Sequence, residues 1–420
     1  MGEEKLGFNA TWSMAVGGMV GGGIFSTLGV VIGISGRWAW LAFLTGGLIA
    51  LAAGYAYTKL AEHAGEGGGA FTFLREVGMP RIAGGLSWVL LVGYVLTNSV
   101  YAFTFGEYLG NVVNLGPWFA RAAAVAVLAL FVAVNLRGVG ESSGLEIVLV
   151  WFKLFVLGAL VAFGLAQWSP DMLSRGVADV GPLAGLFGAA SVFMAYEGFQ
   201  LLTYDYEDID NPDRTLRRAV LSAIAVVIVV YIGVALAVPM LVGADGVVEH
   251  QEVALALAGQ QVAGVVGLIV VTVAAAASTG SAINSTLFAT ARLTRLVAEA
   301  GELPEWIDHR NDQSIPDRAV VVLGLSSGAL AVVGSLGGLV EAASLAFLGT
   351  FATVGWIAFR SRVGSRWITA AGALGAAAAA VALVVRLVTE DPLALGLLAV
   401  VAALAFVARP WILGHVATEG

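Results

Sequence analysis

Long apolar stretches, separated by short polar segments, fill almost the whole chain. Ten of them contain no Asp, Glu, Lys or Arg, and two more are each interrupted once, by Lys153 or by Glu197. A helix needs roughly 20 apolar residues to cross the hydrocarbon core of a bilayer. We therefore predict an all-α integral membrane protein with twelve transmembrane helices. Their stretches are 6–36, 38–58, 82–106, 122–136, 147–170, 180–204, 219–244, 253–291, 319–340, 342–359, 367–385 and 392–408.

The stretch 253–291 is 39 residues long and fits either one long helix or two packed spans. The basic residues decide between these alternatives. With twelve spans and a cytoplasmic N-terminus, 16 Lys and Arg residues fall on the cytoplasmic side and 4 outside, with Lys153 inside the membrane. Because cytoplasmic loops carry an excess of Lys and Arg, we predict one span here. Both termini then lie in the cytoplasm and the protein spans the cytoplasmic membrane several times.

The amino-acid composition argues against several classes of protein and of binding site. The 420 residues are 59% apolar and only 12% charged, whereas a soluble domain carries about 25% charged residues. The basic residues lie in short clusters without interleaved aromatic residues, so no nucleic-acid partner is predicted. The chain has no cysteine, and its four histidines fall in predicted loops or at the C-terminus. We therefore predict no disulfide, no metal site and no cofactor.

Two of the predicted helices carry sequences that weaken a helix. Residues 17–23 of span 1 (GGMVGGG) include five glycines, and residues 193–199 of span 6 read FMAYEGF. Glycine costs about 1 kcal/mol relative to alanine inside a helix. We expect both helices to be unwound at these points, although close packing through small residues is the alternative for each.

The two interruptions lie five spans apart, so the two helices cross the membrane in opposite directions. This spacing predicts two inverted repeats of five helices, a pattern that places a binding site at mid-membrane. We expect one transmembrane domain over residues 1–420. Its first repeat covers about 7–168, its second about 180–360, and two additional helices about 366–413.

Four stretches resemble the amino acid–polyamine–organocation permease superfamily. They are GMVGGGIF at 18–25, GGGAFTFLR at 67–75, FMAYEGF at 193–199 followed by EDIDNPDR at 207–214, and the segment from Arg292 to GELP at 301–304. Asp210 and Arg217 depart from the family pattern in the loop after span 6. The resemblance implies a leucine-transporter-like fold with five-plus-five inverted repeats. It also implies transport of amino acids or amines by proton symport or by exchange, with alternating access.

The two interruptions predict a site for a zwitterion. Amides freed by unwinding of span 1 donate to a substrate carboxylate, and carbonyls freed in span 6 accept from its ammonium group. Asn98 and Tyr101 on span 3 either line this site or form ordinary hydrogen bonds between helices. The predicted substrate-binding residues are Val20, Gly21, Gly22, Gly23, Ile24, Asn98, Tyr101, Phe193, Ala195, Tyr196 and Glu197.

Two ionisable residues fall near mid-membrane, where charges are costly and usually functional. Glu197 either binds an amine, titrates, or holds the two halves of span 6 together. Lys153 is the predicted proton carrier, and the alternative is a lysine permanently bonded to carbonyl groups. The resemblance implies that a lysine on span 5 replaces a sodium ion between spans 1 and 8. Ser278, Thr279 and Ser281 are its predicted hydroxyl partners.

These observations predict a proton-coupled amino acid transporter whose partners are an amino acid, protons and the lipid bilayer. An exchanger of amino acids or amines is the alternative within the same class, and a transport-inactive amino acid sensor is the alternative outside it. An enzyme is not expected, because Glu197 has no obvious acidic partner within the membrane. The sequence leaves the identity of the amino acid, the direction of transport and the oligomeric state undetermined.

Overall fold

Helices account for nearly all the regular structure in the computed structural model. It describes residues 5–138 and 143–390, together with the single positions 396, 399, 403 and 413. The α-helices are α1 Phe8–Ser35, α2 Ala39–Ala64, α3 Gly69–Glu76, α4 Pro80–Val113, α5 Pro117–Leu136, α6 Ser143–Ala166, α7 Leu183–Ser191, α8 Pro212–Glu249, α9 Ala254–Glu299, α10 Asp317–Val333, α11 Leu336–Arg360 and α12 Arg366–Glu390. Short 3-10 helices are η1 Gly36–Trp38, η2 Pro170–Leu173, η3 Phe193–Tyr196, η4 Phe199–Thr203, η5 Tyr206–Asp208 and η6 Glu305–Asp308.

Most predicted spans fall on these helices within the described part of the chain, but the boundary predicted at Glu341 is wrong, because α10 ends at Val333 and α11 already begins at Leu336. Among the described residues, eight helical stretches are long and apolar enough to cross a membrane, the first of which is α1 and α2 taken together. Span 6 is broken into α7, η3 and η4, and α10 has only 17 residues. The last predicted stretch, 392–408, lies outside the described helices, so the count of twelve stays a prediction, as does the inverted repeat.

The ambiguous stretch 253–291 forms the single candidate span α9. Helical geometry is interrupted near its start, at Ala263 and Gly264. The arm before this interruption is too short to cross a bilayer, because a helix rises only about 1.5 Å per residue. One span in this stretch therefore agrees with the prediction made from the basic residues.

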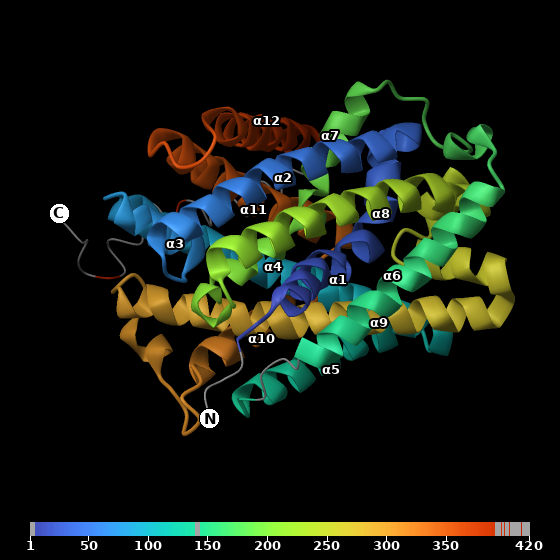
Figure 1. Cartoon of the computed structure of the whole chain (residues 1–420). Coiled ribbons are helices and arrows are strands. Elements are labelled where there is room, and N and C mark those ends of the chain that lie inside the picture. Colours follow the sequence, from blue (N-terminus) through green and yellow to red (C-terminus); the bar gives the residue numbers. More distant parts are fainter. Residues whose placement is uncertain are drawn as a thin grey trace.

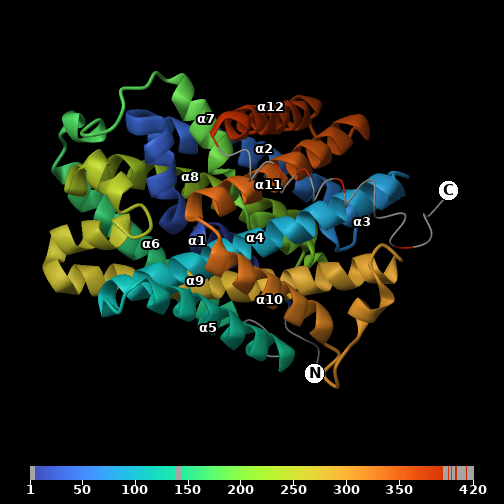
Figure 2. The same ribbon diagram turned by 180° about the vertical axis from the view of Figure 1, so that it is seen from behind.

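Helix α1 occupies the interior of the bundle. Every residue from Ala15 to Ile32 is buried, and α1 packs against α6, α8, α9 and the broken span 6 (Figure 1). Seen from both sides, α12 lies along one edge of the bundle, and α5 and α10 lie along the opposite edge (Figures 1 and 2). Large apolar side chains are exposed on the outer helices, including Phe155 on α6 and Trp367 on α12. Such an apolar exterior suits contact with lipid.

The predicted interruption of span 1 is wrong. Helix α1 is continuous from Phe8 to Ser35, with no non-helical residue inside it. Its glycines instead allow close packing, since a Cβ atom at Gly21 would lie 2.4 Å from Cβ of Ala282 on α9. At Gly22 it would lie 2.0 Å from Cδ1 of Tyr101 on α4. Contacts with the surrounding helices outweigh the low helix propensity of glycine.

Candidate functional site

Span 6 is interrupted where the sequence predicted. Helix α7 ends at Ser191, and the 3-10 helix η3 covers Phe193–Tyr196. Glu197 is extended, with φ −70° and ψ 150°, and Gly198 follows at φ 124°. This positive φ is strained for any residue with a Cβ atom, which explains the glycine. The chain then continues as η4. Peptide groups at the interruption therefore lack the hydrogen bonds of a regular helix, in the middle of the bundle.

Side chains from distant helices form hydrogen bonds with these buried peptide groups. Ser344 on α11 accepts a hydrogen bond from the Met194 amide at 3.0 Å and donates to the Ser191 carbonyl at 2.9 Å. Tyr231 on α8 donates to the Ala195 carbonyl at 2.9 Å and to the Met19 carbonyl of α1 at 2.7 Å. Unpaired peptide groups in an apolar interior are costly, so these bonds stabilise the broken helix.

Two glycines of α1, Gly18 and Gly23, lie directly against this interruption. A Cβ atom at Gly18 would lie 3.0 Å from the Cα atom of Gly198, and one at Gly23 would lie 2.6 Å from the Ala195 carbonyl oxygen. Since α1 is continuous, the amides of Gly21, Gly22 and Gly23 belong to its helix. The prediction that unwinding frees them for a carboxylate is therefore not supported by this structure.

Glu197 is the centre of a buried hydrogen-bond network. Its carboxylate accepts from the Tyr101 hydroxyl of α4 at 3.2 Å and from the Gln200 amide at 2.8 Å. The Gln200 amide oxygen in turn accepts from the Gly198 backbone amide at 2.9 Å. Beyond it, the hydroxyls of Tyr94 and Tyr204 lie 3.1 Å apart. The network connects α4 to the interruption itself and to η4, which follows it.

Asn98 lies one helical turn before Tyr101 on α4 and is 1% exposed. Within the described part of the chain, neither Oδ1 nor Nδ2 of Asn98 has a hydrogen-bond partner. Nearly all buried polar groups in proteins are hydrogen-bonded, so an unpaired buried amide calls for a partner. A bound polar molecule next to the Tyr101–Glu197 pair would provide one.

The other predicted substrate residues are also buried, and their contacts differ. Val20 and Ile24 are fully buried on α1. The Tyr196 hydroxyl donates to the Phe43 carbonyl of α2 at 2.6 Å. The Phe193 ring packs edge-on against Phe351 of α11, with ring centroids 5.5 Å apart.

The predicted coupling residues meet along the seam between α1, α6 and α9. Lys153 on α6 is 1% exposed, and its Nζ donates to the Gly17 carbonyl oxygen of α1 at 3.3 Å. Ser278 on α9 donates to the Val20 carbonyl at 2.9 Å. Ser281, also on α9, donates to the carboxylate of Glu146 on α6. The structure therefore brings these residues into one seam but gives each serine a different partner.

Several residues of the site were not identified from the sequence. Gln200 follows Glu197 by three positions in an otherwise apolar run, and this spacing was a usable signal. Ser344 and Tyr231 carried no such signal, because an isolated hydroxyl in an apolar helix is common. Glu146 marked the edge of a predicted span, yet its side chain is buried. Among the described residues, no cluster of His, Cys, Asp or Glu side chains could hold a metal ion.

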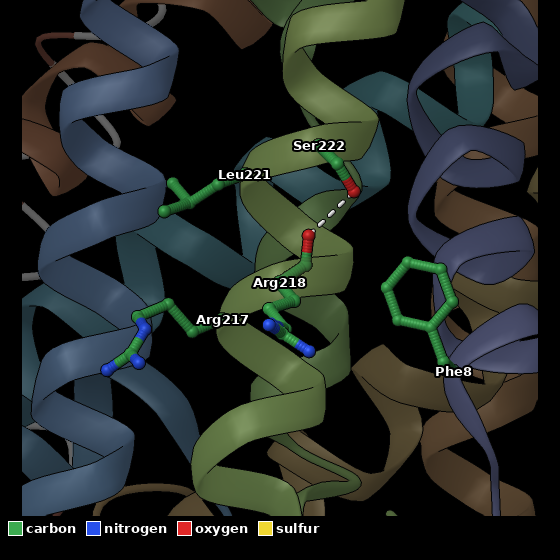
Figure 3. Close-up of a pocket in the computed structure, with 5 residues that line it drawn as sticks. All are labelled: Phe8, Arg217, Arg218, Leu221 and Ser222. Atoms are coloured by element: carbon green, nitrogen blue, oxygen red, sulfur yellow. Dashed lines mark hydrogen bonds between the residues drawn. The ribbon is translucent and has the colours of Figure 1, made fainter.

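A cavity of about 550 Å³ lies away from the Glu197 network, beside the first turns of α1 and α8. It is lined by Phe8, Arg217, Arg218, Leu221 and Ser222. Figure 3 shows Arg217 reaching away from Phe8, and Arg217 forms a 3.2 Å ion pair with Glu62 of α2. Arginines at a predicted cytoplasmic helix end follow the positive-inside rule, so this cavity does not identify the substrate site.

Comparison with known proteins places the chain among transporters. The profile of the amino acid permease family matches residues 6–408. The chain is 31% identical to MJ0609, an uncharacterized protein of Methanocaldococcus jannaschii, over 73% of this chain and 72% of that protein. It is 30% identical to the inner membrane transport protein YbaT of Escherichia coli, over 86% and 84%. It is 24% identical to the serine/threonine exchanger SteT of Bacillus subtilis, over 72% and 70%.

Proposed function

Because the chain belongs to the amino acid permease family, we propose that it carries amino acids across the cytoplasmic membrane by proton-coupled symport. Transport follows alternating access, in which the helices around a buried site expose it to one side of the membrane at a time.

The substrate binds next to the interruption of span 6, in contact with α4 and α1. The observation that carries this assignment is the buried amide of Asn98, which is unpaired among the described residues and lies one helical turn before Tyr101, the residue that bonds to Glu197. A zwitterion satisfies such a site, because the Asn98 Nδ2 group donates to a carboxylate while Glu197 accepts from an ammonium group. Of the predicted α1 residues, Gly22 lies against Tyr101 and Gly23 lies against the Ala195 carbonyl oxygen, so these two form the α1 wall of this site. Phe193, Ala195 and Tyr196 form the wall contributed by span 6.

Lys153 carries the coupling proton. As an ammonium ion it donates to the Gly17 carbonyl and thereby joins α6 to α1. Loss of the proton removes the charge that strengthens this hydrogen bond, so protonation controls the contact between the two helices. Buried lysines also change protonation state readily, which suits this role.

Exchange of one amino acid for another is the second candidate. It is favoured by the similarity to SteT, which is named a serine/threonine exchanger. An exchanger moves a substrate in each direction and needs no net movement of protons. The two mechanisms therefore predict different driving forces for the same protein.

The test uses purified protein. A thermal-shift screen against the amino acids and polyamines identifies the ligand, which stabilises the folded state by mass action. Uptake of that ligand is then measured in proteoliposomes with a proton gradient, and separately with counter-substrate at equal pH on both sides. Gradient-driven accumulation supports symport. Uptake that requires counter-substrate and ignores the gradient supports exchange, and binding without either flux contradicts transport.

A further inference from the structure

A second buried carboxylate lies outside the substrate site. Glu146, in the first turn of α6, is 5% exposed, and Oε2 of its carboxylate accepts a hydrogen bond from Ser281 of α9. A charged side chain is almost never buried in a protein unless it is paired. The substrate site described above makes no use of Glu146.

Glu146 and Lys153 both contact Gly17 of α1. A Cβ atom at Gly17 would lie 1.9 Å from Oε1 of Glu146, so the carboxylate occupies the space that any larger residue would need. The carbonyl oxygen of the same glycine accepts from Lys153 Nζ at 3.3 Å. Glu146 and Lys153 are seven residues apart on α6, which is about two helical turns and places them on one face. Both ionisable side chains therefore contact one residue of α1.

Few other ionisable side chains share this seam. Those of the described α6 are Glu146 and Lys153, and α1 carries none. On α9, the ionisable residues Arg292, Arg295 and Glu299 begin eleven positions beyond Ser281. On α8, Tyr231 donates to backbone carbonyls, and the others lie near the two helix ends. Those α8 residues are Asp213, Arg214, Arg217, Arg218, Asp245 and Glu249.

We propose that Glu146 relays the coupling proton between Lys153 and the cytoplasm. In this step the Lys153 ammonium group loses its proton and becomes a neutral amine, while the Glu146 carboxylate gains it and becomes a carboxylic acid. Glu146 then releases the proton to water on the predicted cytoplasmic side, where α6 begins, and regains its charge. The flexible four-carbon stem of lysine allows its nitrogen to move from the Gly17 carbonyl toward the carboxylate.

Ser281 positions Glu146 for this transfer. Its hydroxyl donates to Oε2, whereas Oε1 is the oxygen that lies against Gly17. The serine therefore holds the carboxylate through Oε2 and leaves Oε1, which lies against Gly17, free of this hydrogen bond. The proposal rests on the proposed function, since it requires Lys153 to carry the coupling proton.

The test compares Glu146→Gln with Lys153→Ala in proteoliposomes. Glutamine keeps the shape of glutamate and accepts from Ser281, but it cannot carry a proton. We expect Glu146→Gln to lower gradient-driven uptake by about tenfold or more and to leave counterflow of substrate at equal pH unchanged. Glu107→Gln, in a half-buried carboxylate near the other end of the bundle on α4, is the matched control and should behave as wild type.

The outcomes separate the relay from the proposed function. Wild-type gradient-driven uptake in Glu146→Gln, with coupling lost in Lys153→Ala, overturns the relay alone. Wild-type coupling in both variants overturns proton transport through Lys153 as well. If folded Glu146→Gln loses both counterflow and gradient-driven uptake, Glu146 has a structural role, and the relay is overturned as well. Should Glu146→Gln fail to fold, Glu146→Asp decides, since a relay predicts a shifted pH profile of uptake and a structural role predicts an unchanged one.

Discussion

The ammonium nitrogen of Lys153 lies 3.3 Å from the carbonyl oxygen of Gly17, in the interior of the bundle. These two residues come from helices whose contact buries both partners, and Gly17 is close enough to α6 that no larger residue fits there. The bond links the central helix to a helix whose opposite face carries the exposed Phe155. A charge on Lys153 therefore acts directly on the contact between α1 and α6.

Replacing Lys153 by alanine should abolish the pH dependence of uptake while substrate binding stays measurable. The alanine variant removes the titrating group and its bond to Gly17, whereas the hydrogen bond between Tyr101 and Glu197 is unaffected. The measurement is initial uptake in proteoliposomes across a series of imposed pH gradients, with binding followed by thermal shift. Persistence of gradient-driven uptake in the folded variant would contradict the coupling role.

Replacing Tyr101 by phenylalanine should weaken substrate binding. The change removes a hydrogen bond to the Glu197 carboxylate, a kind of bond that contributes about 1.5–3 kcal/mol, and we expect affinity to fall about tenfold. Tyr108→Phe is the control, because Tyr108 is buried on the same helix and its hydroxyl has no partner among the described residues. Binding isotherms of the two variants should differ, and equal affinities would place the substrate away from Glu197.

Replacing Gly198 by alanine should destabilise the fold. Its φ of 124° is strained for alanine, and the added Cβ atom would lie 2.5 Å from the Gly18 carbonyl carbon. Together these effects should cost about 1–3 kcal/mol or more. The control Gly158→Ala, on the exposed face of α6, has no atom within 4 Å of its added Cβ. Apparent melting temperatures in detergent should fall for Gly198→Ala alone, and an equal response of both variants would argue against strain at Gly198.

Asp205 should make the stability of the protein depend on pH. It lies in the connection after η4, and burial raises its pKa to about 6, although its ion pair with Arg292 acts in the opposite direction. In the unfolded chain this carboxyl group ionises near its ordinary pKa of about 3.9. Between these values the folded state binds more protons than the unfolded state, so stability falls as pH rises. A shift of this size corresponds to about 3 kcal/mol.

The measurement for Asp205 is the melting temperature in detergent from pH 4 to pH 8. Asp205→Asn should remove the pH-dependent contribution of this carboxyl group to stability. The wild type should therefore lose more stability than the variant as pH rises from 4 to 7. Arg292 keeps a second partner in the variant, because it lies 3.7 Å from the Asp208 carboxylate. Parallel pH curves for the wild type and Asp205→Asn would contradict the raised pKa.

The interruption of span 6 was predictable from the sequence, whereas its stabilisation was not. Residues 193–199 combine aromatic residues, a glutamate and a glycine within an apolar stretch, and this local pattern marks a weak helix. The groups that stabilise the broken segment come from elsewhere, such as Ser344, 150 positions from Met194. No local pattern relates two positions that far apart, because their contact depends on how α11 packs against span 6.

The sequence by itself determined the membrane class, the approximate positions of most long helices that the structure describes and the interruption of span 6, because hydropathy and backbone preference are local properties. Only the tertiary structure decided that the glycine-rich α1 stays helical and that Glu146 lies buried beside Gly17. The physical reason is the same for both. Glycine lowers helix stability by a small local amount, yet it also lets neighbouring helices approach, and the residues that then pack against it lie far away along the chain.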